Sequence, residues 1–301
     1  MGLGTPDPAF NPFLRAELPT LAGLLGGHPP HLEHPALVPG AADPRPSHAH
    51  ATRLLSLDAT LGIDGLPQSG TGQVSILTGA NAARRFGRHF GPWPPVALRE
   101  LLRTRNVLAL AQAAGHRVRF ANAYPAGFPE GVSSRRVAAP PLAAHMAGVL
   151  TAGPDDLVAG GAVASEIVND GWRRFTGRDE IPLVTPEGAG RNLAAIVGDR
   201  GLTLYAHYAT DTAGHRGGMA GAVAALERVD RFLSGLLESL DSRALLVIAS
   251  DHGNVEDVRV GHTRNPALGL VTGPRERVAG LALPTDLTGL APMVLEALGA
   301  S

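Results

Sequence analysis

The sequence predicts an α/β protein in which helices cover both faces of a mainly parallel central sheet. Short apolar runs alternate with longer stretches in which apolar residues recur every three or four positions. This alternation is typical of parallel sheets, because each new parallel strand is reached through a crossover that is usually a helix. With 301 residues, 44% of them apolar, the chain is long enough for one such domain with a small insertion.

The N-terminal part contains a short expected helix at 19–27, closed by two glycines. Residues 28–50 hold five of the twelve histidines among many prolines, and their irregular spacing favours a solvated loop over a metal site. A strand is expected at 52–62. It is followed by a glycine-punctuated turn that leads into an apolar segment at 65–79.

Residues 126–183 are irregular and are expected to form a small cap or insert, whereas residues 1–125 and 184–301 are expected to form the core. Thr185 is the expected N-cap of a helix that has Pro186 in its first turn. The remaining periodic segments predict helices at 96–113, 185–197, 219–240 and 290–299, and strands at 116–124, 202–208, 244–250 and 267–273.

Composition excludes several classes of function. The net charge is −1 and there is no basic stripe, so nucleic acid is not an expected partner. The chain has no cysteine, so any metal must be held by oxygen and imidazole ligands. No apolar run approaches 18 residues, and the first residues do not resemble a signal peptide. The expected location is therefore the cytoplasm, with no membrane partner; the oligomeric state is not encoded in any readable pattern.

Three fragments near strand ends carry side chains that can bind metal. They contribute Asp211 and His215 ("TDTAGH"), Asp251 and His252 ("SDHGN"), and His262 ("GHTRNP"). Each fragment alone has an ordinary structural explanation, such as a helix cap or a polar turn. In α/β sheets, however, the working residues gather beyond the carboxyl ends of the strands. Two carboxylates and three imidazoles there suit two adjacent divalent cations when no thiolate is present.

Five ligands are too few to close two metal sites, so further ligands and a nucleophile are expected elsewhere. Ser69, in "GLPQSGTGQVSILTG", precedes an expected helix and is a candidate for both roles. Simple turn chemistry is the alternative explanation of a serine in a glycine-rich turn.

Taken in order along the chain, "GLPQSGTGQ", "TDTAGH", "ASDHGNVED" and "GHTRNP" resemble the metalloenzyme core of the alkaline phosphatase superfamily. The nearest resemblance is to cofactor-independent phosphoglycerate mutase and phosphopentomutase. It implies an alkaline-phosphatase-like fold and two divalent ions, Mn²⁺ or Zn²⁺. One ion would be held by Asp211, His215 and His262. The other would be held by Asp251, His252 and Ser69, with Ser69 also the phosphoryl acceptor.

The sequence departs from this family in two places. Gln73 stands where the mutases have a histidine, four residues after the nucleophile. The family also opens with a buried strand that ends in Asp-Gly, whereas this chain opens with "MGLGTPDPAFNPF", which resembles the residues just after that pair. One hypothesis is that the start codon was misassigned and that Met1 is not the true first residue. If Met1 is the true start, the chain lacks that strand and its carboxylate, and it should be unstable and nearly inactive.

The resemblance implies phosphoryl transfer from a small phosphorylated metabolite through a phosphoserine intermediate. Hydrolysis is the first hypothesis and a phosphomutase the second, because the 126–183 insert is short for the cap that such mutases carry. A non-catalytic, metal-binding remnant of the fold is the alternative from another class. Arg88 and His89, in "GRHFGPWP", are candidates for contacting substrate, with a solvated turn as the alternative.

Overall fold

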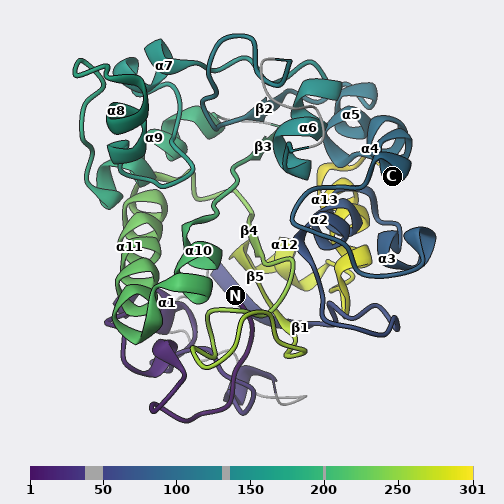
Figure 1. The fold of residues 1–301 in the computed structure, drawn as a ribbon, viewed down its shortest axis with the longest axis vertical. Helices are drawn as coiled ribbons and strands as arrows, with labels where there is room; N and C mark the ends of the chain where they lie inside the picture. Colours follow the sequence, from purple (N-terminus) through teal and green to yellow (C-terminus); the bar gives the residue numbers. More distant parts are fainter. Residues whose placement is uncertain (38–49, 131–135, 199–200, 301) are drawn as a thin grey trace.

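The computed structural model describes residues 1–301 except 38–49, 131–135, 199–200 and 301 (Figure 1). Most of the histidine-rich loop predicted at 28–50 lies outside the described residues. The α/β class is confirmed, since helices surround two small sheets in the middle of the molecule. No helix in the described ranges is both long and apolar enough to cross a bilayer.

The larger sheet has three strands in the order β1-β5-β4. β5 (Ala267–Pro274) is antiparallel both to β1 (His50–Leu57) and to β4 (Leu246–Ala249). The second sheet is a parallel pair, β2 (Val118–Phe120) and β3 (Leu202–Leu204).

The prediction of a mainly parallel sheet is therefore corrected: among the strands that the structure describes, only β2 and β3 pair in parallel, besides isolated parallel bridges at Asp58–Asp286 and Asn122–Val163. The reason lies between β4 and β5. Residues 250–266 form turns rather than the crossover helix that a parallel neighbour requires, so the chain reverses and β5 returns alongside β4.

Helices lie on either side of the sheets: α9 and α11 on one side, and α2, α4, α5 and α13 on the other (Figure 1). The α-helices are α1 (Pro19–Leu24), α2 (Ser69–Thr78), α3 (Ala82–Phe86), α4 (Arg99–Arg105), α5 (Val107–Ala113), α6 (Ala139–Met146), α7 (Pro154–Ala159), α8 (Asp170–Thr176), α9 (Pro186–Val197), α10 (Ala209–Arg216), α11 (Gly218–Ser239), α12 (Arg275–Ala279) and α13 (Leu290–Leu298). Short 3-10 turns occur at Pro12–Leu14, Pro35–Leu37, Val96–Leu98 and Leu287–Gly289.

The helix expected at 96–113 is broken in two by Asn106, which is fully buried and caps α5. Its Oδ1 accepts a hydrogen bond from Ala109 N at 3.0 Å, while its Nδ2 donates to Leu102 O of α4 at 2.8 Å. The predicted cap of α9 is confirmed, since Thr185 Oγ1 accepts from Gly188 N at 3.0 Å.

The α9–α11 contact depends on two glycines. A Cβ at Gly190 would lie 2.2 Å from Phe232 O, and one at Gly235 would lie 2.0 Å from Glu187 O. These backbones can approach only because neither residue has a side chain. This contact fixes the position of α11. It also fixes α10, which directly precedes α11 and carries two of the predicted metal ligands, Asp211 and His215.

The described part of residues 126–183 contains α6, α7 and α8. Leu142 and Ala143 of α6 belong to the same buried cluster as Val74 of α2 and Leu102 of α4, so α6 packs on the core. The interpretation of the segment as a cap or insert stays a prediction.

Candidate metal centre and active site

Ser69 is the first residue of α2, and two glycines place it. A Cβ at Gly70 would lie 2.2 Å from Trp93 O, and one at Gly72 would lie 2.7 Å from Asp251 O. The start of α2 therefore packs backbone to backbone against the loop that carries Asp251. This explains the spacing of glycines in "SGTGQ" and brings Ser69 to the end of β4.

The Ser69 hydroxyl is hydrogen-bonded to His252, with Oγ 2.8 Å from Nε2. His252 is almost fully buried, and its Nδ1 lies 3.2 Å from Gly253 O. Because a carbonyl oxygen can only accept, Nδ1 carries the ring hydrogen and Nε2 accepts from Ser69. This neutral tautomer, with its lone pair on Nε2, is the form of histidine that binds metal once the Ser69 hydrogen is released.

His262 is prepared in the same way. Its Nδ1 donates to Pro67 O at 2.7 Å, just before the α2 turn, which leaves Nε2 as an acceptor. Its ring stacks on that of His252 with centroids 3.9 Å apart. Burial, reinforced by the neighbouring His252, lowers the pKa of His262, which favours the neutral ligand form.

Asp211 lies at the centre of the histidines. Its Oδ1 is 3.7 Å from His215 Nε2, and 3.8 Å from both His252 Nε2 and His262 Nε2. His215 Nε2 and His262 Nε2 are 3.1 Å apart. Because His262 Nε2 is an acceptor, His215 Nε2 can donate to it, or both nitrogens can coordinate one cation.

Asp251 faces the same centre, with Oδ1 3.7 Å from His252 Nε2. Burial raises its pKa, but the electrostatic attraction of the nearby His252 ring and the N-terminus, together with the Gln73 hydrogen bond, outweighs that effect and holds the pKa below its usual range. Gln73 Nε2 donates to Asp251 Oδ2 at 2.9 Å, and its Oε1 accepts from Ala139 N at 3.3 Å. Gln73 therefore links α2, Asp251 and the start of α6.

The donor set fits a divalent cation. One ligand atom each from Asp211, His252 and His262 lies within 4.8 Å of the others, and hydrogen bonds at the opposite ring nitrogen fix both histidines for coordination. This group takes members from both predicted sets. The six predicted side chains thus lie together, while their division between two ions stays a prediction.

Arg88 and His89 lie after α3. Arg88 is exposed, with its guanidinium over the rings of Phe86 and Phe90 at 5.7 and 6.0 Å from their centroids. His89 Nε2 lies 3.3 Å from Ile63 O. Across the described residues, no hydrogen bond joins either side chain to the metal-centre cluster, and their role toward substrate stays a prediction.

Two further residues organise the site and were not singled out from the sequence. Asn254 is fully buried and donates from Nδ2 to Asp211 Oδ1 at 2.6 Å. Glu256, also fully buried, accepts from Gly2 N and Asn254 N, both at 2.7 Å, and from the Thr263 hydroxyl at 2.5 Å. Both stand in "DHGNVED", where charged and amide residues two and four places after His252 could have been read as its supports.

The fold and the donor set define an α/β protein with a candidate divalent-metal centre. Residues 197–301, which carry five of the six candidate ligands, match the model of the Metalloenzyme superfamily. The resemblance to these metalloenzymes that the sequence predicts is confirmed.

The most similar curated relatives include 2,3-bisphosphoglycerate-independent phosphoglycerate mutases. That of Thermomicrobium roseum is 34% identical over 130 residues, covering 39% of this chain and 25% of the relative. That of Desulforudis audaxviator is 38% identical over 98 residues, covering 30% and 19%. The chain thus spans about a quarter of the length of the first of these relatives.

Among solved structures, the PH0037 protein of Pyrococcus horikoshii aligns over all of this chain and 96% of its own, with a TM-score of 0.56 and 12% identity. At that identity the similarity concerns the fold alone.

Proposed function

We propose that this protein is a metal-dependent phosphoryl-transfer enzyme in which Ser69 accepts the phosphoryl group. The observation that carries the proposal is the position of Ser69 Oγ, 2.8 Å from His252 Nε2 inside a cluster of two carboxylates and three imidazoles. An exposed structural serine in a turn would not need that setting. Ser69 also opens a helix, where N–H groups without an intrahelical partner suit an anion; of these, Thr71 N already donates to Phe90 O at 2.9 Å.

In the reaction, Ser69 Oγ attacks the phosphorus of a phosphate monoester in line with the leaving oxygen. The new P–O bond forms as the ester P–O bond breaks, and the alkoxide that leaves takes a proton from water. In the arrangement seen here the Ser69 hydroxyl donates to His252 Nε2; with an ion held at that nitrogen, the Ser69 proton would instead be released to water. Divalent ions, Mn²⁺ or Zn²⁺, held by Asp211, His215 and His262 and by Asp251, His252 and Ser69, would favour the serine alkoxide and neutralise phosphate charge.

The phosphoserine is then resolved. In the hydrolase that we favour, water attacks the phosphorus, releases inorganic phosphate and restores the Ser69 hydroxyl. In a phosphomutase, a second hydroxyl of the substrate takes the group. The similarity to phosphoglycerate mutases favours that second candidate. Against it stands the short segment at 126–183, which leaves little chain for a cap that retains an intermediate.

The test is phosphate release from p-nitrophenyl phosphate with added Mn²⁺ or Zn²⁺, by the parent chain, Ser69→Ala and Ser234→Ala. Ser234 is an exposed serine of α11 and serves as the matched control. The proposal predicts metal-dependent release by the parent and Ser234→Ala only. Conversion of 3-phosphoglycerate to its isomer without phosphate release would indicate the mutase instead. If the folded, metal-loaded chain catalyses neither reaction, the non-catalytic alternative remains.

A further inference from the structure

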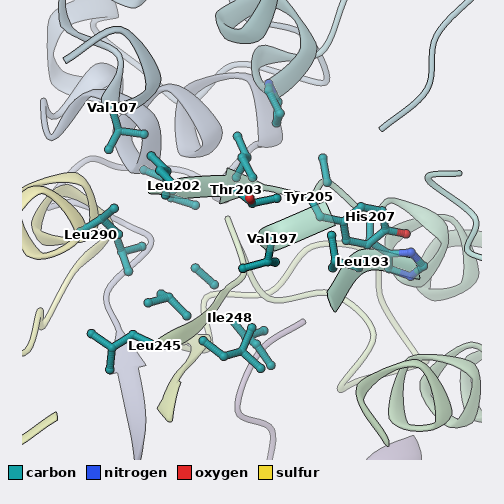
Figure 2. A pocket seen from close by; sticks show the side chains of 18 of the residues that line it. Val107, Leu193, Val197, Leu202, Thr203, Tyr205, His207, Leu245, Ile248 and Leu290 are labelled. Atoms are coloured by element: carbon teal, nitrogen blue, oxygen red, sulfur yellow. The ribbon is translucent and has the colours of Figure 1, made fainter. Parts of the chain in front are cut away.

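A cavity of about 740 Å³ lies between β3 and β4, with Leu202 on one side and Ile248 on the other (Figure 2). Its lining includes Ser69, Asp211 and His252, so the cavity is continuous with the candidate metal centre. A second group of side chains that can bind metal follows α1 directly. We call it the histidine triad, and its members are His28, His31 and His34.

The fold brings the three rings of the histidine triad together, although their spacing in the sequence favours an ordinary loop. The centroid of the His34 ring lies 6.2 Å from that of His28 and 5.8 Å from that of His31. A tetrahedral ion with nitrogen ligands at about 2.0–2.1 Å would hold imidazole centroids roughly 5 Å apart. Both pairs are therefore within about 1 Å of the spacing in a closed metal site.

The relative orientation of the rings also suits a shared ion. His28 and His31 are inclined to the His34 ring by 77° and 62°, so neither stacks face to face on it. Imidazoles that surround one ion meet through their nitrogen-bearing edges, whereas stacked rings direct their nitrogens away from a common point. Small side-chain rotations are enough to close the triad around an ion.

Burial differs among the three rings in a way that allows an ion to enter. His34 is only 1% exposed, His31 is half-buried and His28 is exposed. The buried ring supplies a fixed first ligand, and the two more accessible rings can close over an ion that arrives from solvent. Water can hold a remaining coordination position on the open side.

The backbone of the triad is restrained before any ion binds. Residues 28–35 include three prolines, each of which fixes its own φ. His34 N donates to His31 O at 3.1 Å, and Leu32 N donates to Gly4 O at 2.9 Å, which ties this turn to the N-terminal segment. Less conformational entropy is therefore lost when the side chains gather around a ligand.

Two of the three imidazoles favour the neutral form, which is the form that coordinates metal. Burial lowers the pKa of His34, and the neighbouring His31 lowers it further. Burial also lowers the pKa of His31, against the opposing effect of the Glu33 charge. His31 Nδ1 accepts from Glu33 N at 3.2 Å. His31 therefore coordinates either through Nδ1 after this contact opens, or through Nε2 in the other tautomer.

We propose that the histidine triad is a second metal site, sharing no residue with the metal centre, that binds an imidazole-preferring ion such as Zn²⁺, Ni²⁺ or Cu²⁺. Three nitrogen ligands without a carboxylate among them favour these ions over Mn²⁺, which prefers oxygen. The ion joins three points of one short segment, so its role is to stabilise that turn. The argument rests on the geometry of the triad and is independent of the proposed enzyme activity.

The experiment is footprinting with diethyl pyrocarbonate, which modifies accessible neutral imidazoles, with each modified histidine located by tandem mass spectrometry. The 301-residue chain is treated without added metal, with Ni²⁺ and with Mn²⁺. The proposal predicts that Ni²⁺, at about ten times its dissociation constant, slows modification of His28 and His31 roughly tenfold. Mn²⁺ should leave both rates unchanged. His145, an exposed histidine of α6, should react equally in all three samples.

A count of bound Ni²⁺ by equilibrium dialysis gives a second readout. His28→Asn/His31→Asn should bind one Ni²⁺ fewer per chain than the parent. His116→Asn/His145→Asn, which changes one half-buried and one exposed histidine as the first variant does, should bind the same number as the parent. If the first variant does not fold, the footprint of the parent chain decides alone.

Unchanged modification of His28 and His31 at saturating Ni²⁺ would overturn the proposal. Equal Ni²⁺ counts in the parent and in folded His28→Asn/His31→Asn would also overturn it. Equal protection by Mn²⁺ would contradict the assignment to an imidazole-preferring ion.

Discussion

Ser69 Oγ and His252 Nε2 are 2.8 Å apart, although 183 positions separate the two residues along the chain. α2 brings the serine and the loop after β4 brings the histidine, and Gly72 allows the two backbones to meet. The hydrogen on His252 Nδ1 is held toward Gly253 O, so the nitrogen that faces Ser69 is the acceptor. The contact is thus a chemically oriented pair rather than an incidental proximity.

Asn254→Ala is expected to weaken binding of Mn²⁺ or Zn²⁺ by tenfold to a hundredfold, roughly the cost of losing a residue that orients a metal ligand. Its Nδ2 holds Asp211 Oδ1 at 2.6 Å, and without it that carboxylate can rotate away from the histidines. Isothermal titration calorimetry measures the affinity, with Asp241→Asn, an exposed change outside the cluster, as control. Equal affinities for Asn254→Ala and the parent would contradict this role.

Glu256→Gln is expected to lower the free energy of unfolding by about 3 kcal/mol or more, because a buried amide would direct its own donor at groups that donate. Gly2 N and Asn254 N both donate to Oε2 of Glu256, and Thr263 Oγ1 donates to Oε1. Urea denaturation checks the change. Glu276→Gln, an exposed change in α12, is the control and should leave the midpoint within error. A Glu256→Gln midpoint equal to that of the parent would count against the carboxylate as the organiser of this loop.

His207 is expected to make the fold sensitive to mild acid. Burial lowers the pKa of its imidazole from 6.5 to about 4, and its Nδ1 donates to Ser165 O at 2.8 Å. When the pH lies between about 4 and 6.5, His207 of the unfolded chain binds a proton, whereas His207 of the folded chain does not. Stability from this group is therefore complete above pH 6.5 and falls as the pH drops toward 4, by about 3 kcal/mol at most.

His207→Asn retains a donor near the position of Nδ1 and removes the titrating ring. Denaturant titrations at pH 7 and pH 4.5 should show a smaller acid-induced loss of unfolding free energy in this variant than in the parent. His145→Asn, which changes an exposed histidine, should leave the loss unchanged. Equal losses in His207→Asn and the parent would show that His207 does not contribute.

The sequence predicted which side chains lie together at the candidate metal centre better than it predicted the sheet that positions them. Asp251 and His252 directly follow an apolar run that becomes β4, and their position at a strand end is visible in the letters. The direction of β5 cannot be read from the sequence, because an apolar run such as 267–273 has the same composition whether the strand is parallel or antiparallel to its neighbour. Only the turns of residues 250–266, which depend on the buried Glu256 accepting hydrogen bonds from across the loop, make it antiparallel.

Hydrogen bonds between residues far apart in the sequence could not be predicted either. Gln73 differs from the histidine expected at that position, and its hydrogen bonds to Asp251 and Ala139 follow only from the way α2 packs on the rest of the fold. The helix break at Asn106 was missed because the apolar periodicity continues through it on both sides.

The measurement that most directly tests the account is intact-mass analysis of the metal-loaded protein, rapidly quenched in acid during turnover of a phosphate monoester. The account predicts a species heavier by one phosphoryl group, with the added mass on the peptide that contains Ser69, and none in Ser69→Ala. Turnover in which no protein-bound phosphoryl group accumulates, together with full activity of Ser69→Ala, would contradict it.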